Sequence, residues 1–226
     1  MNKKQILSLF YGLSAIYFIA EVIDLNLIEN IARVSIPIVV FLFYYFFSPR
    51  HHIIPCAILV TGLIGDIFLL WHSSTAAKIF LSVFGINHII YIYVCFSAIN
   101  NLDLKKLIFS AIPVIILWFI YFNYSIKDIF GGQMGDLYPF IIVYSVILSL
   151  FTIFSLVNFF NNEEKVNLYL VIIALCYLVV EIIMAIDNFV SEMFIFDLTK
   201  VVARVVGYFF LMRFVATFKF RFKRLY

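Results

Sequence analysis

Five ionisable side chains stand inside long apolar stretches of this 226-residue sequence. Carboxylic acids and imidazoles at such positions have the chemistry to donate and accept protons. A charge at the middle of a bilayer costs about 2.5–3.5 kcal/mol on insertion scales, so such groups face the interior of a helix bundle and are candidates for function. The five residues are Glu21, Asp66, His88, Glu181 and Arg204.

Four of these residues are predicted to lie at one depth. At about 1.5 Å of rise per residue, Asp66, Glu181 and Arg204 each lie roughly five or six residues below the same membrane surface. Glu21 lies nearer that surface, and His88 falls near the middle of its apolar stretch. A single polar cavity would produce such a shared depth.

Each of these residues also has a structural interpretation. Glu21 could extend its side chain to the interface, and Arg204 could be a counter-ion for one of the carboxylates. His88 could be a neutral packing residue. Asp66 is the hardest to explain in this way, because its short side chain cannot reach far toward water.

A polar stripe follows one of the apolar stretches. Phe84, His88 and Tyr91 stand at positions i, i+4 and i+7 and therefore share one face of a helix. Asn87 extends the stripe, because it stands four residues before Tyr91. We expect Asn87 and Tyr91 to contact a substrate and His88 to take part in catalysis.

Two glycines precede Asp66 at a spacing that suits close helix packing. Gly62 and Gly65 would let a neighbouring helix approach and exclude lipid from the carboxylate. Plain helix packing explains the same glycines.

The composition predicts an all-α protein that lies in a membrane. Hydrophobic residues make up 65% of the chain and charged residues 13%, against about a quarter charged in soluble domains. With about 20 apolar residues per crossing, we predict one transmembrane domain over residues 1–226 that contains eight spans. The longest connection is expected over residues 123–139. The predicted spans are residues 6–24, 30–47, 53–71, 79–98, 107–123, 138–159, 167–187 and 198–217.

The basic residues predict the orientation. Eight spans place both ends of the chain on one side of the membrane, and the Lys and Arg residues outside the spans gather on that side. By the positive-inside rule both termini are cytoplasmic, in the inner membrane if the source is bacterial. That side carries Lys3, Lys4, Arg50, Lys105, Lys106, Lys165, Lys219, Arg221, Lys223 and Arg224, and the other side carries Lys78, Lys127 and Lys200.

Several other classes of function lack support in the sequence. Basic residues do not form a stripe with aromatics outside the spans, so no nucleic-acid partner is expected. His88 is the one histidine inside a span, which is too few ligands for a metal. No glycine-rich phosphate loop is present, so we expect no cofactor. The three cysteines fall in apolar runs and do not indicate a disulfide framework.

The two carboxylates also suggest an internal repeat. Asp66 and Glu181 would each stand in the third span of a four-span half, and both spans run outward. His88 and Arg204 follow them at 22 and 23 residues. We therefore consider a parallel 4+4 duplication.

Two motifs together resemble the YhhN family of membrane proteins. The family carries Gly-Asp in its third span and Phe-x-x-x-His-x-x-Tyr in the next, and the matching residues here are Gly65, Asp66, Phe84, His88 and Tyr91.

The family's seventh span carries a second acidic motif, and "VEIIMAIDNF" is similar to it. Glu181 takes the place of the family's Asp, and Ala185 and Phe189 match its Ala and Phe. Val180 stands where the family has Ser.

The resemblance implies an enzyme. Characterised members of the family are lysoplasmalogenases, which hydrolyse the vinyl ether bond of a lysophospholipid and release a fatty aldehyde and a glycerophospho-base. The resemblance implies Asp66 and Glu181 as the acid pair, with His88 and Tyr91 orienting water or substrate and Arg204 holding a carboxylate ionised or meeting the lipid phosphate. The alternatives are a hydrolase of another lysolipid or ether lipid, and a non-catalytic membrane protein that binds or transports a lipid or solute.

Overall fold

Eight α-helices and one short 3-10 helix form nearly all of the structure, a computed structural model that describes residues 2–48, 51–71, 73–98, 112–130, 132, 134–191 and 193–217. Within these residues there is no strand. The all-helical fold predicted from the sequence is confirmed. The helices are α1 (Lys3–Val22), α2 (Asn26–Phe47), α3 (Ile53–Phe68), α4 (Ser74–Ala98), α6 (Ile112–Phe130), α7 (Tyr138–Asn161), α8 (Lys165–Phe189) and α9 (Phe194–Thr217), with the 3-10 helix at Gly135–Leu137.

Five of the helices are long and apolar enough to cross a membrane: α1, α2, α4, α7 with the 3-10 turn before it, and α8. The helix α3 is apolar but has 16 residues. Four charged residues stand within α9, at positions 197, 200, 204 and 213. Eight spans were predicted, and the structure supports five of them by length and composition. For α3, α6 and α9 the prediction of a membrane span rests on the sequence alone.

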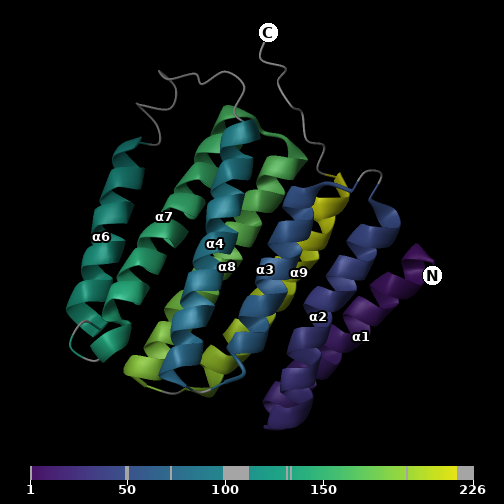
Figure 1. Cartoon of the computed structure of the whole chain (residues 1–226), viewed down its shortest axis with the longest axis horizontal. Coiled ribbons are helices and arrows are strands. Elements are labelled where there is room, and N and C mark those ends of the chain that lie inside the picture. The colour runs from purple at the N-terminus through teal and green to yellow at the C-terminus, as the bar shows by residue number, and fades with distance from the viewer. Residues whose placement is uncertain are drawn as a thin grey trace.

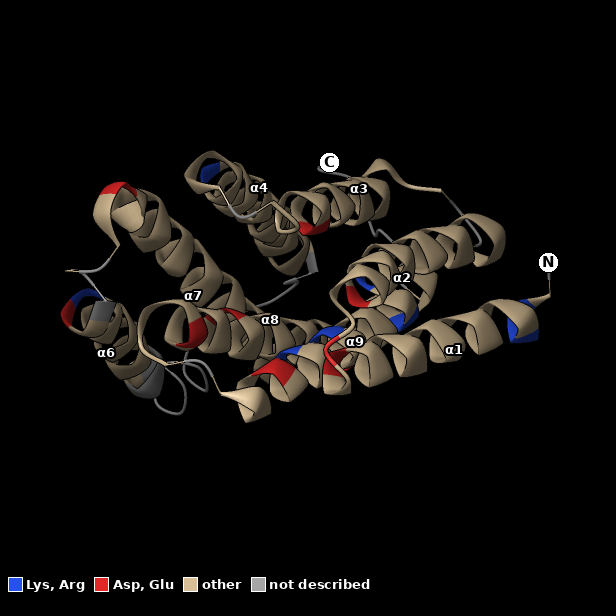
Figure 2. Cartoon of the chain, turned by 90° about the horizontal axis from the view of Figure 1, so that it is seen from below, with Lys and Arg blue, Asp and Glu red and all other residues tan. Residues whose placement is uncertain are grey.

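Six of the helices form a closed ring. Each of α2, α3, α4, α7, α8 and α9 packs against the next in that order, and α9 packs against α2. Figure 2 shows this ring end-on, with α1 outside it against α2 and α9, and α6 outside it against α7. Side chains that point inward from α3, α4, α8 and α9 therefore share one interior.

The packing has the pattern that a duplication would give. The contacts α1–α2–α3–α4 recur as α6–α7–α8–α9, and α2 meets α9 as α7 meets α4. Asp66 and Glu181 lie on α3 and α8, which correspond under this pattern. The 4+4 repeat stays a prediction, because packing alone does not establish a common origin of the two halves.

Consecutive helices run antiparallel, and α1 begins at the end of the bundle where α9 ends (Figure 1). The turn between α1 and α2 is tight and places Asp24 at a φ of 55°, a left-handed conformation that Asp tolerates better than most residues. At the opposite end, the connection between α2 and α3 is held by Tyr44, whose hydroxyl donates to the His52 carbonyl and accepts from its backbone amide.

One predicted boundary is wrong. The sequence placed residues 123–139 in a connection, but α6 continues to Phe130. Residues 123–130 mix apolar and polar side chains but contain neither Gly nor Pro, so nothing in them ends a helix before Gly131. Residues 107–111, at the start of the predicted span, lie outside the described residues.

Candidate functional site

The site begins where α3 and α4 approach closely. A Cβ added at Gly65 would overlap the ring of Phe84, so the absence of a side chain at Gly65 lets the two helices meet. Asn87 fastens the same pair, because its amide donates to the Ile58 carbonyl and to the Thr61 hydroxyl, both at 2.7 Å. These bonds fix the middle of α3 against α4, and the close approach at Gly65 fixes the part next to Asp66.

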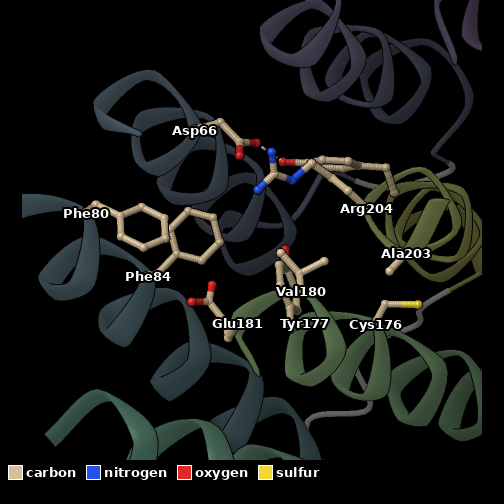
Figure 3. A pocket seen from close by; sticks show the side chains of 11 residues that line it. Asp66, Phe80, Phe84, Cys176, Tyr177, Val180, Glu181, Ala203 and Arg204 are labelled. Atoms are coloured by element: carbon tan, nitrogen blue, oxygen red, sulfur yellow. Dashed lines mark hydrogen bonds between the residues drawn. The ribbon is translucent and has the colours of Figure 1, made fainter. Parts of the chain in front are cut away.

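Asp66 lies inside the ring, and its residue is 1% exposed. Its carboxylate accepts a hydrogen bond from the hydroxyl of Tyr208 on α9. Figure 3 shows the guanidinium of Arg204 beside the same carboxylate. The helix α9 thus provides both groups that favour an ionised carboxylate on α3, namely a hydroxyl donor and a neighbouring cation.

The helices α8 and α9 each contribute two polar side chains at a spacing of four residues. Tyr177 and Glu181 stand on α8, and Arg204 and Tyr208 stand on α9. The hairpin that carries them is fixed beyond the site by Lys200, whose ammonium lies 2.5 Å from Asp187 on α8. Because α8 and α9 are packing neighbours in the ring, both pairs reach the same interior.

A small cavity of about 20 Å³ lies between these groups. A cavity needs roughly 10–15 Å³ of this measure to hold a water molecule, so the space suits about one water. Asp66 and Glu181 point toward it from opposite sides in Figure 3. The polar lining consists of Asp66, Glu181, Arg204, Tyr177 and Tyr208.

A much larger apolar groove of about 1010 Å³ adjoins the small cavity, and Glu181 and Phe80 line both. The groove is walled by α4, α6, α7 and α8, with mainly aliphatic and aromatic side chains such as Trp118, Ile141 and Leu148. Pockets for drug-sized ligands measure about 300–1,000 Å³, so the groove has room for a long alkyl chain. Glu181 is half-buried at the junction of the two spaces.

The structure brings three of the predicted site residues together: Asp66, Glu181 and Arg204 share the small cavity. Glu21 does not line it. Its charge neighbours are Glu29, Asp197, Lys200 and Arg33, so it belongs to a separate charged cluster near the turn between α1 and α2.

The predicted residues on α4 stand behind the cavity wall. His88 is fully buried among rings, and its centroid lies 5.0 Å from that of Tyr177, which does line the cavity. Tyr91 stacks on Phe151 at 4.8 Å. The Asn87 amide donates its hydrogen bonds to Ile58 and Thr61 on α3. None of the three lines the small cavity, and their predicted roles in catalysis and substrate binding stay predictions.

Sequence reasoning missed Tyr208, Tyr177 and Tyr144. Tyrosine is common in membrane proteins, so its presence in a span carries little signal. The spacing would have identified two of them, because Tyr208 follows Arg204 and Tyr177 precedes Glu181 by four residues. Tyr144, on α7, lines the groove and is a polar neighbour of Glu181.

Fold and site together define a helical membrane protein that holds two carboxylates and an arginine around a buried, water-sized cavity. The sequence model of the YhhN family matches residues 31–214, and the chain belongs to that family. Searches of curated proteins and of solved structures found no match. Over the described residues no group of three or more His, Cys, Asp or Glu side chains is arranged to hold a metal ion.

Proposed function

We propose that this protein hydrolyses the vinyl ether bond of a lysoplasmalogen, a single-chain ether phospholipid, inside the membrane. The observation that carries the proposal is the position of Glu181, at the junction of a water-sized polar cavity and an alkyl-sized apolar groove. Hydrolysis of a lipid bond needs both spaces to meet at the reacting atoms. Membership of the YhhN family is consistent with such a hydrolase-like role.

The chemistry requires an acid and a stabilising anion. Proton transfer to the outer carbon of the vinyl ether gives an oxocarbenium ion, which water then attacks at the carbon bonded to oxygen. The resulting hemiacetal breaks into a fatty aldehyde and the glycerol hydroxyl of a glycerophospho-base. Glycosidases divide comparable work between two carboxyl groups, one protonated and one ionised.

The surroundings favour Glu181 as the acid and Asp66 as the anion. Asp66 accepts a hydrogen bond from Tyr208 and has Arg204 beside it, and both contacts stabilise an ionised carboxylate. Glu181 borders the apolar groove, where a neutral carboxylic acid is less costly than a charge. In this assignment Asp66 stabilises the oxocarbenium ion and orients the water.

The predicted site residues on α4 act through residues that line the cavity and do not line it themselves. His88 and Tyr91 each pack against the ring of Tyr177, so each is a positioning residue for the cavity wall. Asn87 holds α3 against α4 and thereby sets the position of Asp66.

A panel of lysolipids tests the proposal. Purified protein is incubated with an alkenyl lysophospholipid, its acyl counterpart and its saturated alkyl ether, and the products are separated as aldehyde and fatty acid. Aldehyde from the alkenyl lipid alone supports vinyl ether cleavage. Fatty acid from the acyl lipid would instead indicate an esterase, and the absence of any product with retained lipid binding would indicate a binding or transport protein.

We also propose that both termini are cytoplasmic, so that the end of the bundle opposite the termini faces outward, in the inner membrane if the source is bacterial. The distribution of basic residues supports this orientation. A fluorescent-protein fusion after Tyr226 should be bright and a periplasmic phosphatase fusion there inactive. The reverse result would contradict the orientation.

A further inference from the structure

A second arginine, Arg33 on α2, lies close to the site and has no role in the chemistry described so far. Its Nε is buried and has no hydrogen-bond partner. An unsatisfied guanidinium donor in a buried position costs free energy, so it calls for an explanation such as a bound anion.

Arg33 and Arg204 are charge neighbours, with Tyr17 of α1 next to both. Arg204 donates from Nη1 to the Tyr17 hydroxyl at 3.3 Å. Asp66 and Glu29 are acidic charge neighbours of Arg33, and Arg33 is in turn a charge neighbour of Glu21.

No ion pair satisfies either guanidinium. Among the described residues the ion pairs within 4.0 Å are those of Lys200 with Asp187 and Asp197, and neither involves Arg33 or Arg204. Arg33 keeps a buried Nε donor without a partner, and Arg204 is its charge neighbour. Two neighbouring guanidinium groups suit a phosphate, because each can donate two parallel hydrogen bonds to its oxygens.

The location of the pair matches the order of groups in a single-chain phospholipid. Arg33 stands on α2 and Arg204 on α9, two helices that pack against each other on one side of the ring (Figure 2). The apolar groove lies on the other side, between α4, α6, α7 and α8. Asp66 and Glu181 line the cavity between them, so a phosphate, a scissile bond and an alkyl chain would follow one another across the ring.

We propose that Arg33 and Arg204 together bind the phosphate of a single-chain phospholipid whose chain occupies the groove. Arg33 is thus a specificity-determining residue that selects phosphorylated lipids over neutral alkylglycerols. The proposal rests on the proposed function for the position of the reacting bond.

Binding of a lipid that cannot be cleaved tests this proposal separately from catalysis. The probes are a saturated alkyl-ether lysophospholipid and the corresponding alkylglycerol without phosphate, and affinity is measured in nanodiscs by calorimetry. Glycerol 3-phosphate and inorganic phosphate are added as competitors, so that a site for free phosphate is distinguished from a site for the lipid. The variants are Arg33→Gln, Arg33→Lys and, as a matched control, Arg213→Gln, which removes an exposed arginine elsewhere on α9.

We expect the wild type to bind the phosphorylated lipid more tightly than the alkylglycerol. Arg33→Gln should lower that preference about 10–100-fold, because the loss of a hydrogen bond to a charged group weakens binding by about this factor. Arg33→Lys should restore part of the preference and Arg213→Gln should retain it, with millimolar phosphate competing weakly. An unchanged preference in a folded Arg33→Gln variant would overturn the proposal, as would equal affinity of the wild type for both lipids. Strong competition by free phosphate would also overturn it, by indicating a site for the small anion. A preference that depends on Arg33 without any aldehyde release would refute the proposed reaction and leave the phosphate site standing.

Discussion

The two carboxylates of the site occupy different surroundings although they line one cavity. Asp66 is 1% exposed, accepts a hydrogen bond from Tyr208 and lies beside an arginine. Glu181 is half-buried and borders the apolar groove, with Tyr144 as a polar neighbour. Arg204 is a charge neighbour of both carboxylates, so what separates them is the hydrogen bond from Tyr208 at Asp66 and the apolar border at Glu181. In the proposed reaction this difference assigns the charge to Asp66 and the proton to Glu181, because polar contacts stabilise the ionised form and an apolar border favours the neutral one.

This contrast follows from the ring. The helix α9 carries the polar partners of Asp66, whereas α8 borders the groove that α4, α6 and α7 complete. If α3 and α8 are related by duplication, equivalent positions have taken different roles because their neighbours differ. The predictions below test the contrast in order of expected effect.

The largest effect is expected from Asp66→Asn. The variant keeps the volume of the side chain and removes the anion, so aldehyde release should fall about 10²–10³-fold, the range for loss of one group that stabilises charge in the transition state. Asp197→Asn is the matched control, because Asp197 forms an ion pair with Lys200 away from the cavity. Near-normal turnover by folded Asp66→Asn would refute the role of Asp66.

Glu181 is tested by two substitutions. Glu181→Gln removes the acid and should lower aldehyde release about 10²-fold or more, while Glu181→Asp restores the family's usual residue and should retain most of the activity. Initial rates at saturating lipid measure both. Near-normal activity of folded Glu181→Gln would refute the role of Glu181 as the acid, and an inactive Glu181→Asp would show that the length of the side chain is also required.

Tyr208→Phe tests the hydrogen bond that distinguishes Asp66 from Glu181. A hydrogen bond to a charged group contributes about 1.5–3 kcal/mol, so we expect roughly a 10–100-fold loss of kcat. Tyr177→Phe serves for comparison, because this tyrosine lines the same cavity from the Glu181 side. A smaller effect at Tyr208 than at Tyr177 would reverse the proposed roles of the two sides.

The smallest effect is expected from filling the groove. Ala77→Trp places a large ring in the groove wall and should raise KM for long-chain substrates, since each methylene that loses its burial costs about 0.8 kcal/mol. Short-chain substrates should be affected less. Leu117→Trp is the control, because Leu117 is 69% exposed on the outside of α6. Equal effects on KM for all chain lengths would show that the groove does not bind the alkyl chain of the substrate.

Much of the fold was predictable because long apolar runs in a sequence predict membrane helices. All eight helices overlap their predicted ranges, and the clearest error, the end of α6, arose where polar residues continue a helix without a Gly or Pro. The ring was not predictable in this way, because the sequence pattern does not say which helix packs against which.

The site was predictable to the extent that burial of charge is unusual. Asp66, Glu181 and Arg204 stand out because a charge in a span has a high cost, and the structure places them around one cavity. Tyr208 could not be identified as a site residue by this criterion, because an uncharged tyrosine is tolerated in a membrane. Arg33 was overlooked because its position near a helix end explained its charge without reference to any partner.

The most direct test of the central claim is the reaction of an alkenyl lysophospholipid in D₂O. If a carboxylic acid in the cavity protonates the vinyl carbon, the fatty aldehyde should carry one deuterium on the carbon next to the carbonyl, as mass spectrometry of the trapped aldehyde would show. The rate at which the labelled aldehyde forms should depend on Glu181 and Asp66. Aldehyde without deuterium at that carbon, or a labelled product formed equally by the Asp66→Asn/Glu181→Gln double variant, would contradict the account.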